Sequence, residues 1–379
     1  MINFFNNKYY KNYLFRYVCS IIMENKIVNV LVIFGATGDL ANRKIFPAIN
    51  EIYNSKKLPE NFHIIGCGRK EIKSNIFKEL SSDLLEKSKY LKLDPTLDND
   101  YKVLVKNLNK FQNEYDNINV IFYLSTPPSA YKPIIKNLVK NSLNNESSGY
   151  RRIIVEKPFG RNLESAKELN TTLTNGFNES QIFRIDHYLG KETVQNILVS
   201  RFTNLIFSAL WNKEFISYVE ITAAESIGIK GRGEYYDNSG AIRDMFQNHL
   251  LELLCLVAME EPNKNSPESI RNEKINVLKK IRKLNFQDDI VRGQYTSSET
   301  NNKKFKSYTE NEGVKKNSKT ETFFACKLFV DNDRWRDIPF FIRTGKRLPT
   351  KVTEIVVNFK KNINVFSPNN ETNMLIFRL

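Results

Sequence analysis

The chain has 379 residues, with 57 Lys or Arg against 42 Asp or Glu, so its formal net charge is +15. This length exceeds one ordinary core and predicts two domains, and the 41% hydrophobic content excludes a disordered chain. The positive charge favours anionic partners, but scattered lysines without an aromatic and basic pattern disfavour nucleic acid. The apolar stretch at residues 17–23 is far shorter than the roughly 20 residues of a membrane span. We therefore expect a globular protein that binds phosphorylated small molecules, with no membrane association.

Residues 1–26 are predicted to form an N-terminal extension ahead of the first domain. Their basic start and short apolar run weakly resemble a targeting peptide, but no small-residue cleavage site is evident. The four cysteines, at positions 19, 67, 255 and 326, show no metal-type pairing. We interpret them as reduced thiols, which favours a cytoplasmic protein without a disulfide framework.

The first predicted domain begins with a continuous apolar, β-branched run over residues 27–34, as expected of a buried parallel strand. The run ends at the turn Gly35-Ala-Thr-Gly38, after which apolar residues recur at helical spacing. A strand, a glycine turn and a helix are the context of a dinucleotide-binding fingerprint, in which glycine lets the backbone approach the pyrophosphate. The pattern is Gly-x-x-Gly-x-x-Ala rather than the full fingerprint, so a plain tight turn is the alternative. Pro47 should kink the helix or mark a late start.

The next predicted strand, Phe62–Ile65, ends in Gly66-Cys-Gly-Arg69. NAD enzymes usually place an acidic residue at the end of the second strand to bind the ribose hydroxyls, whereas an arginine accommodates the 2′-phosphate of NADP. Arg69 therefore favours NADP, with a solvated surface arginine as the alternative.

Strands and helices alternate over residues 27–185, which predicts a Rossmann-like, doubly wound parallel sheet. Helical patterns cover Ile72–Leu91 and Ser129–Val139, and further strands are expected at Asn119–Ser125 and Arg152–Val155. Lys157 follows the last of these strands, and open α/β sheets bind ligands at the carboxyl ends of their strands. The alternative is a lysine that merely flanks the Pro-Phe turn after it.

The stretch Arg184–Glu192 concentrates polar side chains between an apolar run and an amphipathic segment. A strand that leads into a helix there would bring together the carboxylate, imidazole, phenol and ammonium of Asp186, His187, Tyr188 and Lys191. An imidazole and an ammonium can bind a phosphate, and a carboxylate can orient a second, distant base. Each residue alone would be ordinary surface or core polarity, so only their concentration favours a site for a charged substrate.

Residues 186–379 are predicted to form an α+β domain with a mainly antiparallel sheet, because the strands after residue 320 follow one another without helices. Strands are expected at Ile216–Ala224, Thr322–Val330, Pro339–Ile342, Val352–Phe359 and Met374–Phe377. A glycine-rich loop, Gly228–Gly240, leads into a long apolar helix, Ala241–Met259, that carries His249. A histidine in a buried helix is usually a satisfied core residue, although a carboxylate from elsewhere in the fold could be its partner.

Two further segments of this domain are polar or basic. Residues 296–319 are rich in Ser, Asn, Lys, Thr and Glu, which predicts a mobile loop. The turn Arg343–Lys351 is basic and lies between two predicted strands, with a solvated hairpin as the alternative interpretation.

Five separated stretches resemble glucose-6-phosphate dehydrogenase, in the same order as in that family. They are Gly35–Ala41, Ile154–Gly160, Arg184–Glu192, Arg243–His249 and Arg343–Lys346. The resemblance covers residues 27–379 with few gaps apart from the 296–319 loop. It implies oxidation of D-glucose 6-phosphate to 6-phosphogluconolactone with NADP, the first step of the oxidative pentose phosphate pathway.

The resemblance also implies roles for individual residues. His249 is expected to be the general base that takes the C1 hydroxyl proton, and Asp186 to orient its imidazole and stabilise the protonated form. The residues expected to bind the substrate are Lys157, His187, Tyr188, Lys191, Glu225, Asp244, Lys346 and Lys351. Those expected to bind the cofactor are Gly35, Thr37, Gly38, Asp39, Leu40, Arg69, Tyr131 and Lys157. No metal is expected, because hydride transfer needs none.

The chain departs from the family pattern at its end, because it stops at Leu379 within a predicted strand while family members continue. The missing part normally completes the second sheet and contributes to a dimer interface, so we expect a truncated domain with an open sheet edge. A homodimer or homotetramer is expected if the C-terminus were complete. The alternative function is an inactive fragment or partner subunit that binds NADP without turnover. A related dehydrogenase of unphosphorylated sugars is disfavoured by His187 and Lys191.

Overall fold

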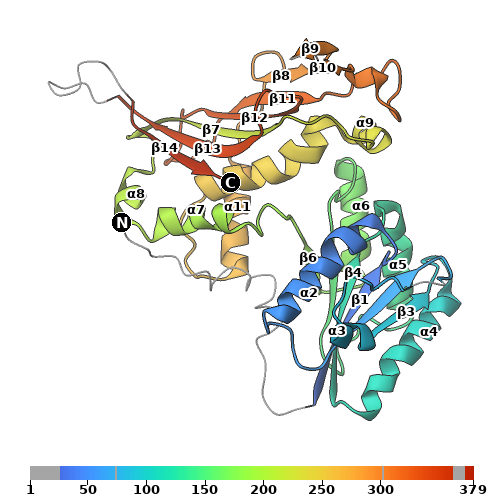
Figure 1. Cartoon of the computed structure of the whole chain (residues 1–379). Helices are drawn as coiled ribbons and strands as arrows, with labels where there is room; N and C mark the ends of the chain where they lie inside the picture. The colour runs from blue at the N-terminus through green and yellow to red at the C-terminus, as the bar shows by residue number, and fades with distance from the viewer. Residues whose placement is uncertain (1–25, 73–74, 301–302, 362–371) are drawn as a thin grey trace. The chain divides into compact units, whose positions relative to one another are not determined.

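The computed structural model describes residues 26–72, 75–300, 303–361 and 372–379, and it divides into two compact units, residues 1–185 and 186–379 (Figure 1). The predicted extension over residues 1–26 lies, apart from Lys26, outside the described residues. Within the described part of the chain, every helix is too short or too polar to cross a lipid bilayer.

The first unit is built on a six-stranded parallel sheet with the order β3-β2-β1-β4-β5-β6. Its strands are β1 (Ile27–Phe34), β2 (Phe62–Gly68), β3 (Ser88–Lys92), β4 (Asn117–Leu124), β5 (Arg151–Val155) and β6 (Ile182–Arg184). The order reverses between β1 and β4, and doubly wound sheets bind their ligands beyond the carboxyl ends of the strands at this point. The predicted Rossmann-like sheet is therefore confirmed.

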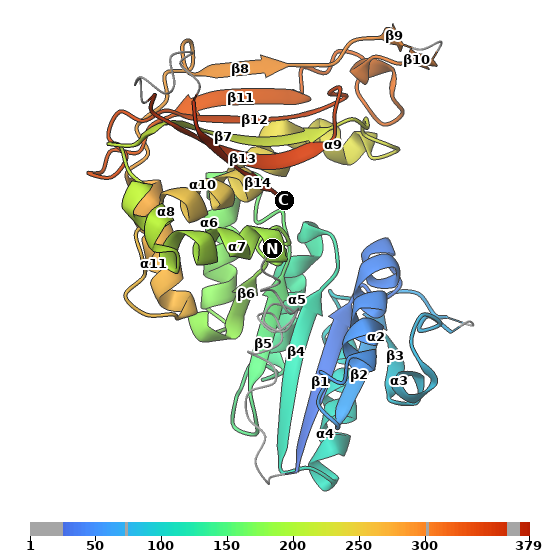
Figure 2. The same cartoon turned by 60° about the vertical axis from the view of Figure 1, so that its left-hand side comes forward.

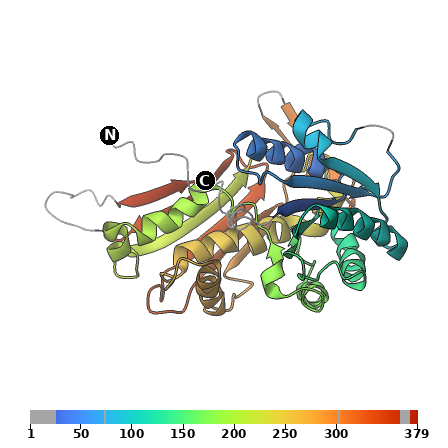
Figure 3. The same ribbon diagram turned by 90° about the horizontal axis from the view of Figure 1, so that it is seen from below.

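Helices cover both faces of this sheet (Figure 3). α2 (Phe46–Asn54) and α3 (Ser82–Glu86) pack on one face, where Phe46 and Ile33 share a core. α4 (Asp98–Asn109) and α5 (Tyr131–Lys140) pack on the other face with α6 (Leu163–Thr174), and Leu104 and Val30 share that core. Every residue of β1 after Ile27 is buried, as expected of a central parallel strand.

Two local predictions for this unit are resolved by the structure. The predicted helix over Ile72–Leu91 is wrong, because only α3 is helical there and β3 follows it, with residues 73–74 outside the description. β3 is an edge strand with one buried residue, Leu91, so its sparse apolar positions resemble a helical spacing. Pro47 is the second residue of α2, but helical structure already begins at residue 39 and continues through the π-helix Ala41–Ile45 into α2. The predicted late start at Pro47 is therefore wrong, and a π-helical turn instead precedes the residue that lacks an N–H.

The second unit is built on a mixed, mainly antiparallel sheet with the order β14-β13-β7-β12-β11-β8 (Figure 2). Its strands are β7 (Ile216–Glu225), β8 (Ile290–Gly293), β11 (Phe323–Leu328), β12 (Phe340–Lys346), β13 (Val352–Phe359) and β14 (Met374–Arg378). Neighbouring strands are antiparallel except β7 and β12, which are parallel. The predicted fold class is confirmed for this unit too.

Helices of this unit lie along one face of the sheet (Figure 1). They are α7 (Glu192–Phe202), α8 (Leu205–Leu210), α9 (Gly233–Ala241), the π-helix η5 (Ile242–Leu250), α10 (Leu251–Ala258) and α11 (Pro267–Lys279). The carboxyl end of α10 is fixed by Trp211, Trp335 and Arg201, which donate hydrogen bonds of 2.6–2.9 Å to carbonyls of residues 256–259. These bonds satisfy carbonyls that a helix end leaves unpaired, and they anchor the helix that continues η5.

The predicted helix over Ala241–Met259 has nearly the observed bounds but differs in its geometry. A separate helix, α9, begins at Gly233 inside the segment predicted as a loop, and the chain bends at Gly240, where φ is 66° and ψ is 177°, before helical dihedrals resume at Ala241. The nine residues Ile242–Leu250 form a π-helix before regular α-helix resumes at Leu251.

The segment predicted as a mobile loop, residues 296–319, is also structured where it is described. It forms a hairpin of β9 (Ser298–Thr300) and β10 (Lys303–Phe305), followed by a 3₁₀ turn at Tyr308–Glu310. Tyr308 is fully buried, and its hydroxyl donates to Asp237 of α9 at 3.0 Å. One buried aromatic residue anchors the segment despite its polar composition.

Candidate active site

The centre of the candidate site is a contact between Asp186 and His249, which lie 63 positions apart in the sequence. The Nδ1 atom of His249 lies 2.6 Å and 2.7 Å from the two carboxylate oxygens of Asp186. His249 is fully buried, and Asp186 lies in a turn in which the Tyr188 N–H donates to its carboxylate at 2.8 Å. The structure therefore brings together the two residues that the sequence analysis assigned to catalysis.

This geometry assigns the proton of the imidazole. An ionised carboxylate only accepts hydrogen bonds, so the hydrogen of neutral His249 lies on Nδ1 and the lone pair lies on Nε2. Burial alone would raise the pKa of Asp186, but the hydrogen bond and charge of His249 outweigh burial and hold this pKa below its ordinary value. Asp186 therefore stays ionised at neutral pH and can stabilise an imidazolium.

The π-helix explains how one helix presents both Asp244 and His249 on one side. These residues are five positions apart, which would place them roughly 140° apart around an α-helix. A π-helix forms its hydrogen bonds between residues five apart, so such residues stack in adjacent turns. Asp244 and His249 are both buried, and the Tyr235 hydroxyl donates to Asp244 at 3.2 Å.

Two aromatic rings enclose the His249 imidazole. Tyr188 stacks on it with ring centres 4.2 Å apart and planes at 16°. His187 meets it edge-on, with ring centres 4.5 Å apart. The pKa of Tyr188 is raised chiefly by burial, so its phenol stays protonated and can donate a hydrogen bond. The imidazole is thus fixed by packing as well as by Asp186.

A positive region adjoins this group. The Nζ atom of Lys191 lies 4.2 Å from the centre of the Tyr188 ring. Burial, and then the positive charge of Lys351, lower the pKa of Lys191 below its ordinary value. Two lysines that repel each other in this way are stabilised by a shared anion, so this region suits a phosphate.

Lys346 and Glu225 form a second charged pair in this unit. Lys346 is buried at the end of β12, and its ammonium bonds to the Glu225 carboxylate at the end of the parallel neighbour β7. The ammonium also lies 5.1 Å from the centre of the Tyr236 ring. A buried lysine with one carboxylate retains donor capacity for a sugar hydroxyl, since an ammonium has three donors.

The predicted cofactor residues lie in the first unit, around the β1 turn. Gly35 has φ of 83°, and a Cβ atom there would overlap the carbonyl of Ser125 at the end of β4. The Gly38 N–H donates to the Gly35 carbonyl at 2.9 Å, which closes the turn. Only glycine fits the first position, so the turn is of the kind that a dinucleotide-binding loop requires.

Two hydroxyl groups beside this turn support a bound cofactor. The buried oxygen atoms Oγ of Ser125 and Oγ1 of Thr126 have no hydrogen-bond partner among the described residues. Buried hydroxyls are normally satisfied, so a ligand is a reasonable partner for them. The residues at this edge therefore fit a nicotinamide dinucleotide.

The remaining predicted cofactor residues differ in exposure. Thr37, Asp39 and Arg69 are exposed near the β1 and β2 ends, and Leu40 is half-buried. Tyr131 is buried in the core, with its hydroxyl 3.4 Å from the Glu156 carbonyl, so the protein already occupies most of its surface. Lys157 is half-buried just after β5 in the first unit, whereas the other predicted substrate residues lie in the second.

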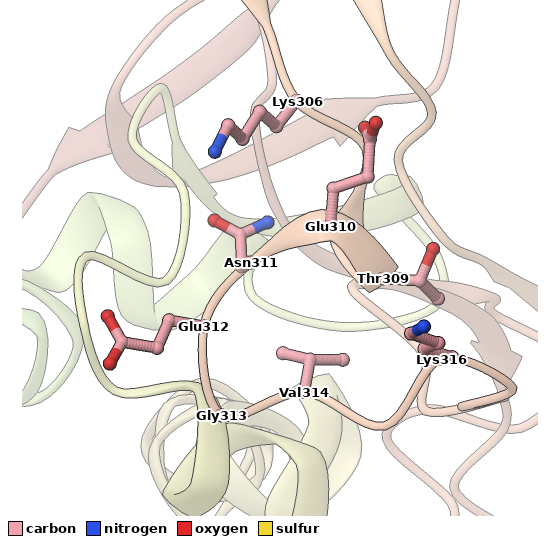
Figure 4. A pocket seen from close by; sticks show the side chains of 8 residues that line it. All are labelled: Lys306, Thr309, Glu310, Asn311, Glu312, Gly313, Val314 and Lys316. Atoms are coloured by element: carbon pink, nitrogen blue, oxygen red, sulfur yellow. The ribbon is translucent and has the colours of Figure 1, made fainter.

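Two other features have some properties of a binding site. Asp186, His187 and His249 offer ligand atoms within 4.8 Å of one another, a spacing that could hold a metal ion. The same cluster results when Asp186 orients the His249 imidazole beside that of His187. The hydrogen bond between Asp186 and His249 favours this interpretation over a metal site. A hollow of about 630 Å³ opens within residues 306–316 (Figure 4), but its lining comes from one loop and includes none of the predicted site residues.

Sequence reasoning did not identify the residues that surround and support the site. Tyr235 forms a hydrogen bond with Asp244, and Thr353 forms one with Tyr188. Ser125 lies beside the cofactor turn. These residues are common polar types without a motif of their own, and only the tertiary structure places them. On the cofactor side, the Thr126-Pro-Pro128 turn after β4 is the sequence feature that could have indicated Ser125.

Comparison with known families gives two matches that together span most of the chain. The NAD binding domain of glucose-6-phosphate dehydrogenase matches residues 32–196, and the C-terminal domain of the same family matches residues 198–379.

Individual relatives agree with these matches. The glucose-6-phosphate 1-dehydrogenase of Aggregatibacter actinomycetemcomitans is 46% identical over 369 residues, which cover 92% of this chain and 75% of that protein. The enzyme of the same name from Treponema pallidum is 44% identical, over 88% of this chain and 69% of that protein.

Solved structures agree as well. A glucose-6-phosphate dehydrogenase in complex with its substrate glucose-6-phosphate has a TM-score of 0.86 and 36% identity, over 94% of this chain and 77% of that one. The glucose-6-phosphate 1-dehydrogenase from Mycobacterium avium has a TM-score of 0.79 and 35% identity, over 93% and 76% of the two chains.

Proposed function

Because the chain belongs to the glucose-6-phosphate dehydrogenase family, we propose that it oxidises D-glucose 6-phosphate to 6-phosphogluconolactone with NADP. Membership makes it an oxidoreductase that uses a nicotinamide dinucleotide. The observation that carries the proposal is the Asp186–His249 contact, because a buried imidazole held by a carboxylate is the base that a hydroxyl oxidation needs.

In the proposed reaction, His249 accepts the proton of the C1 hydroxyl on Nε2, while Asp186 holds Nδ1–H and stabilises the imidazolium that forms. NADP, when bound, accepts the hydride from C1, so the carbon–oxygen bond becomes the lactone carbonyl. The substrate phosphate and sugar would be bound by eight residues: His187, Tyr188, Lys191, Lys351, Glu225, Asp244, Lys346 and Lys157.

The cofactor assignment rests on the first unit. Gly35 and Gly38 give the backbone the close approach that the pyrophosphate requires, with Thr37, Asp39 and Leu40 in the same turn. Arg69 is exposed just after β2, where an arginine suits the 2′-phosphate of NADP. The preference for NADP over NAD, the contact from Tyr131, and a homodimer or homotetramer remain predictions of the resemblance.

The direct test is NADPH formation by the purified chain with glucose 6-phosphate and NADP. Glucose replaces the substrate in one control, and NAD replaces the cofactor in another. Turnover confined to the phosphorylated sugar supports the proposal. A folded chain that binds NADP without turnover would instead support the alternative of an inactive partner subunit.

A further inference from the structure

The helix that carries Asp244 and His249 is held at its start by one carboxylate from a distant segment. The N–H of Ala241 donates to the backbone carbonyl of Glu321 at 3.0 Å, and the N–H of Ile242 donates to the Glu321 side-chain oxygen Oε1 at 3.0 Å. The first N–H groups of a helix lack intrahelical partners and carry partial positive charge, so an anion there is favourable. Glu321 thus satisfies the start of η5 with both its backbone and its side chain.

The bend that precedes this helix leaves room for the same carboxylate. Gly240 has φ of 66°, a region that favours glycine, and a Cβ atom there would overlap the Glu321 carboxyl group. The direction of η5 is therefore set by two matched features, a residue without a side chain and the carboxylate packed against it.

The residue after Glu321 ties the same segment to the Lys346 strand. Thr322 is fully buried, and its carbonyl accepts a hydrogen bond from the Lys346 N–H at 2.9 Å. Its N–H donates to the Gly293 carbonyl, and its hydroxyl accepts from the Tyr295 N–H, both at 2.9 Å. Two consecutive residues thus join the helix with the proposed base to the strand with the buried lysine.

We propose that Glu321 is a positioning residue for the oxidation, which holds η5 so that His249 and Asp244 face the substrate. The inference deepens the proposed function and rests on it. Ile242 is two residues from Asp244 and seven from His249, so a change in tilt at Ile242 moves both side chains. The hydrogen bond, rather than the charge alone, carries this role, because Oε1 lies at bonding distance from one particular N–H.

Three substitutions separate these contributions. Glu321→Gln keeps the length and an acceptor oxygen without the charge, Glu321→Asp keeps the charge but is one methylene shorter, and Glu321→Ala removes both. Glu310→Ala is the matched control, because Glu310 caps the 3₁₀ turn at Tyr308 through Ser307 rather than the start of η5. Each variant is assayed for kcat and for the KM of both substrates. The ring resonances of isotope-labelled histidine are also recorded, and the chain has only three histidines.

We expect Glu321→Ala and Glu321→Asp to lower kcat by about 10- to 100-fold, since a misplacement of about 1 Å can cost about 10²-fold. Glu321→Gln should retain most of the turnover, the KM for NADP should not change, and the His249 resonances should shift in the two impaired variants only. If Glu321→Ala does not fold, the Asp and Gln variants still decide the matter. An equal loss of kcat in Glu321→Asp and Glu321→Gln, or wild-type kcat in both variants, would overturn the proposal.

Failure of this inference is distinguishable from failure of the proposed function. A wild-type chain that does not oxidise glucose 6-phosphate contradicts the function, and the histidine resonances then still report whether Glu321 positions His249. A wild-type chain that is active, with Glu321→Ala equally active and His249 resonances unchanged, contradicts the inference alone.

Discussion

At the scale of single residues, the candidate site depends on contacts that fix one imidazole from three directions. Asp186 binds Nδ1, Tyr188 stacks on one face of the ring, and His187 meets it edge-on. Because Nδ1 faces the Asp186 carboxylate, the proposed reaction assigns proton transfer to Nε2. The role of each neighbour can be tested by substituting one side chain at a time.

The first prediction concerns the proposed base. His249→Asn should lower kcat by about 10²- to 10⁴-fold, the usual contribution of a positioned general base. NADP binding should stay near normal, because the predicted cofactor residues belong to the first unit. Steady-state rates and a cofactor titration by fluorescence provide both measurements.

The matched control for this substitution is His63→Asn in β2. His63 packs against Phe111 with ring centres 4.8 Å apart and belongs to neither proposed binding region. It should keep most of the wild-type turnover. Wild-type turnover in His249→Asn would remove His249 from the mechanism.

The second prediction uses the pKa of Lys191, which burial and then Lys351 hold below the ordinary value of 10.5. Because the pKa is lowered, the ammonium is lost at a lower pH than in an ordinary lysine. If Lys191 binds the phosphate, kcat/KM for glucose 6-phosphate should fall on the alkaline side as this proton dissociates. Lys351→Gln removes the repelling charge but not the burial, so the decline should move to higher pH.

The measurement is kcat/KM as a function of pH in both proteins. Lys351→Gln should also weaken substrate binding overall, but that loss lowers the whole profile without moving its alkaline limb. An unchanged limb, or one that moves to lower pH, would show that Lys191 does not govern this decline.

The residues of the site were only partly predictable from the sequence. His249 and Asp186 were assigned because their motifs resemble a family, and composition alone would have favoured a satisfied core histidine. Glu321 gave no signal, because it lies in a short polar stretch between the predicted mobile loop, residues 296–319, and the strand predicted from Thr322. Its partner is set by the bend at Gly240, and a bend of that kind depends on tertiary packing rather than on local propensity.

At the scale of elements, hydrophobic periodicity identified most strands but missed β3, β8 and the hairpin of β9 and β10. The predicted strand Val352–Phe359 has the observed bounds, and its β-branched residues Ile355 and Val357 are buried. The helix over residues 241–259 was predicted with an α-helical period. Its first half is instead a π-helix, which presents Asp244 and His249 on one side. Periodicity cannot distinguish the two within nine residues. The prediction of a mobile loop over residues 296–319 was wrong for another reason. The segment is held by the hydrogen bond between Tyr308 and Asp237, which are far apart in sequence.

The third prediction tests the bend before η5. Gly240→Ala places a side chain at φ of 66° and ψ of 177°, a region adopted almost only by glycine, which costs about 1–3 kcal/mol. The Glu321 carboxyl group would also have to move, and the loss of its hydrogen bond to the Ile242 N–H should add to this cost. The free energy of unfolding from urea titration should therefore fall by at least that amount, and kcat should fall with it.

Gly231→Ala is the matched control, because Gly231 has a φ of 71° with no atom within 4 Å of the added Cβ position. It measures the cost of positive φ without crowding. An equal loss of stability in the two variants would show that the Glu321 carboxylate does not limit the space at Gly240.

At the scale of the whole molecule, the two units have separate sheets and separate cores. Residues of β1, α2, α4 and α5 form the cores of the first unit, and those of β7, β12 and α10 form the core of the second. The overall architecture was the most predictable property, since strand and helix alternate up to residue 185 and consecutive strands dominate after residue 320. The proposed cofactor contacts fall in the first unit and most proposed substrate contacts in the second, so the two ligands should stabilise different parts of the chain.

The last prediction follows from this division. A ligand that binds only the folded state stabilises it by about 2.7 kcal/mol at a concentration of 100 times its Kd. NADP at such a concentration should slow amide hydrogen exchange chiefly in residues 26–72 and 117–185, which include the Gly35 turn and β4. Glucose 6-phosphate should slow exchange chiefly around residues 186–202 and 242–258, which include Asp186 and His249. Mass spectrometry of peptides from the intact chain resolves these regions, with NAD and glucose as controls. Protection of η5 by unphosphorylated glucose as strong as that by glucose 6-phosphate would contradict a phosphate site at Lys191, because the phosphate supplies the charged contacts on which the assignment rests.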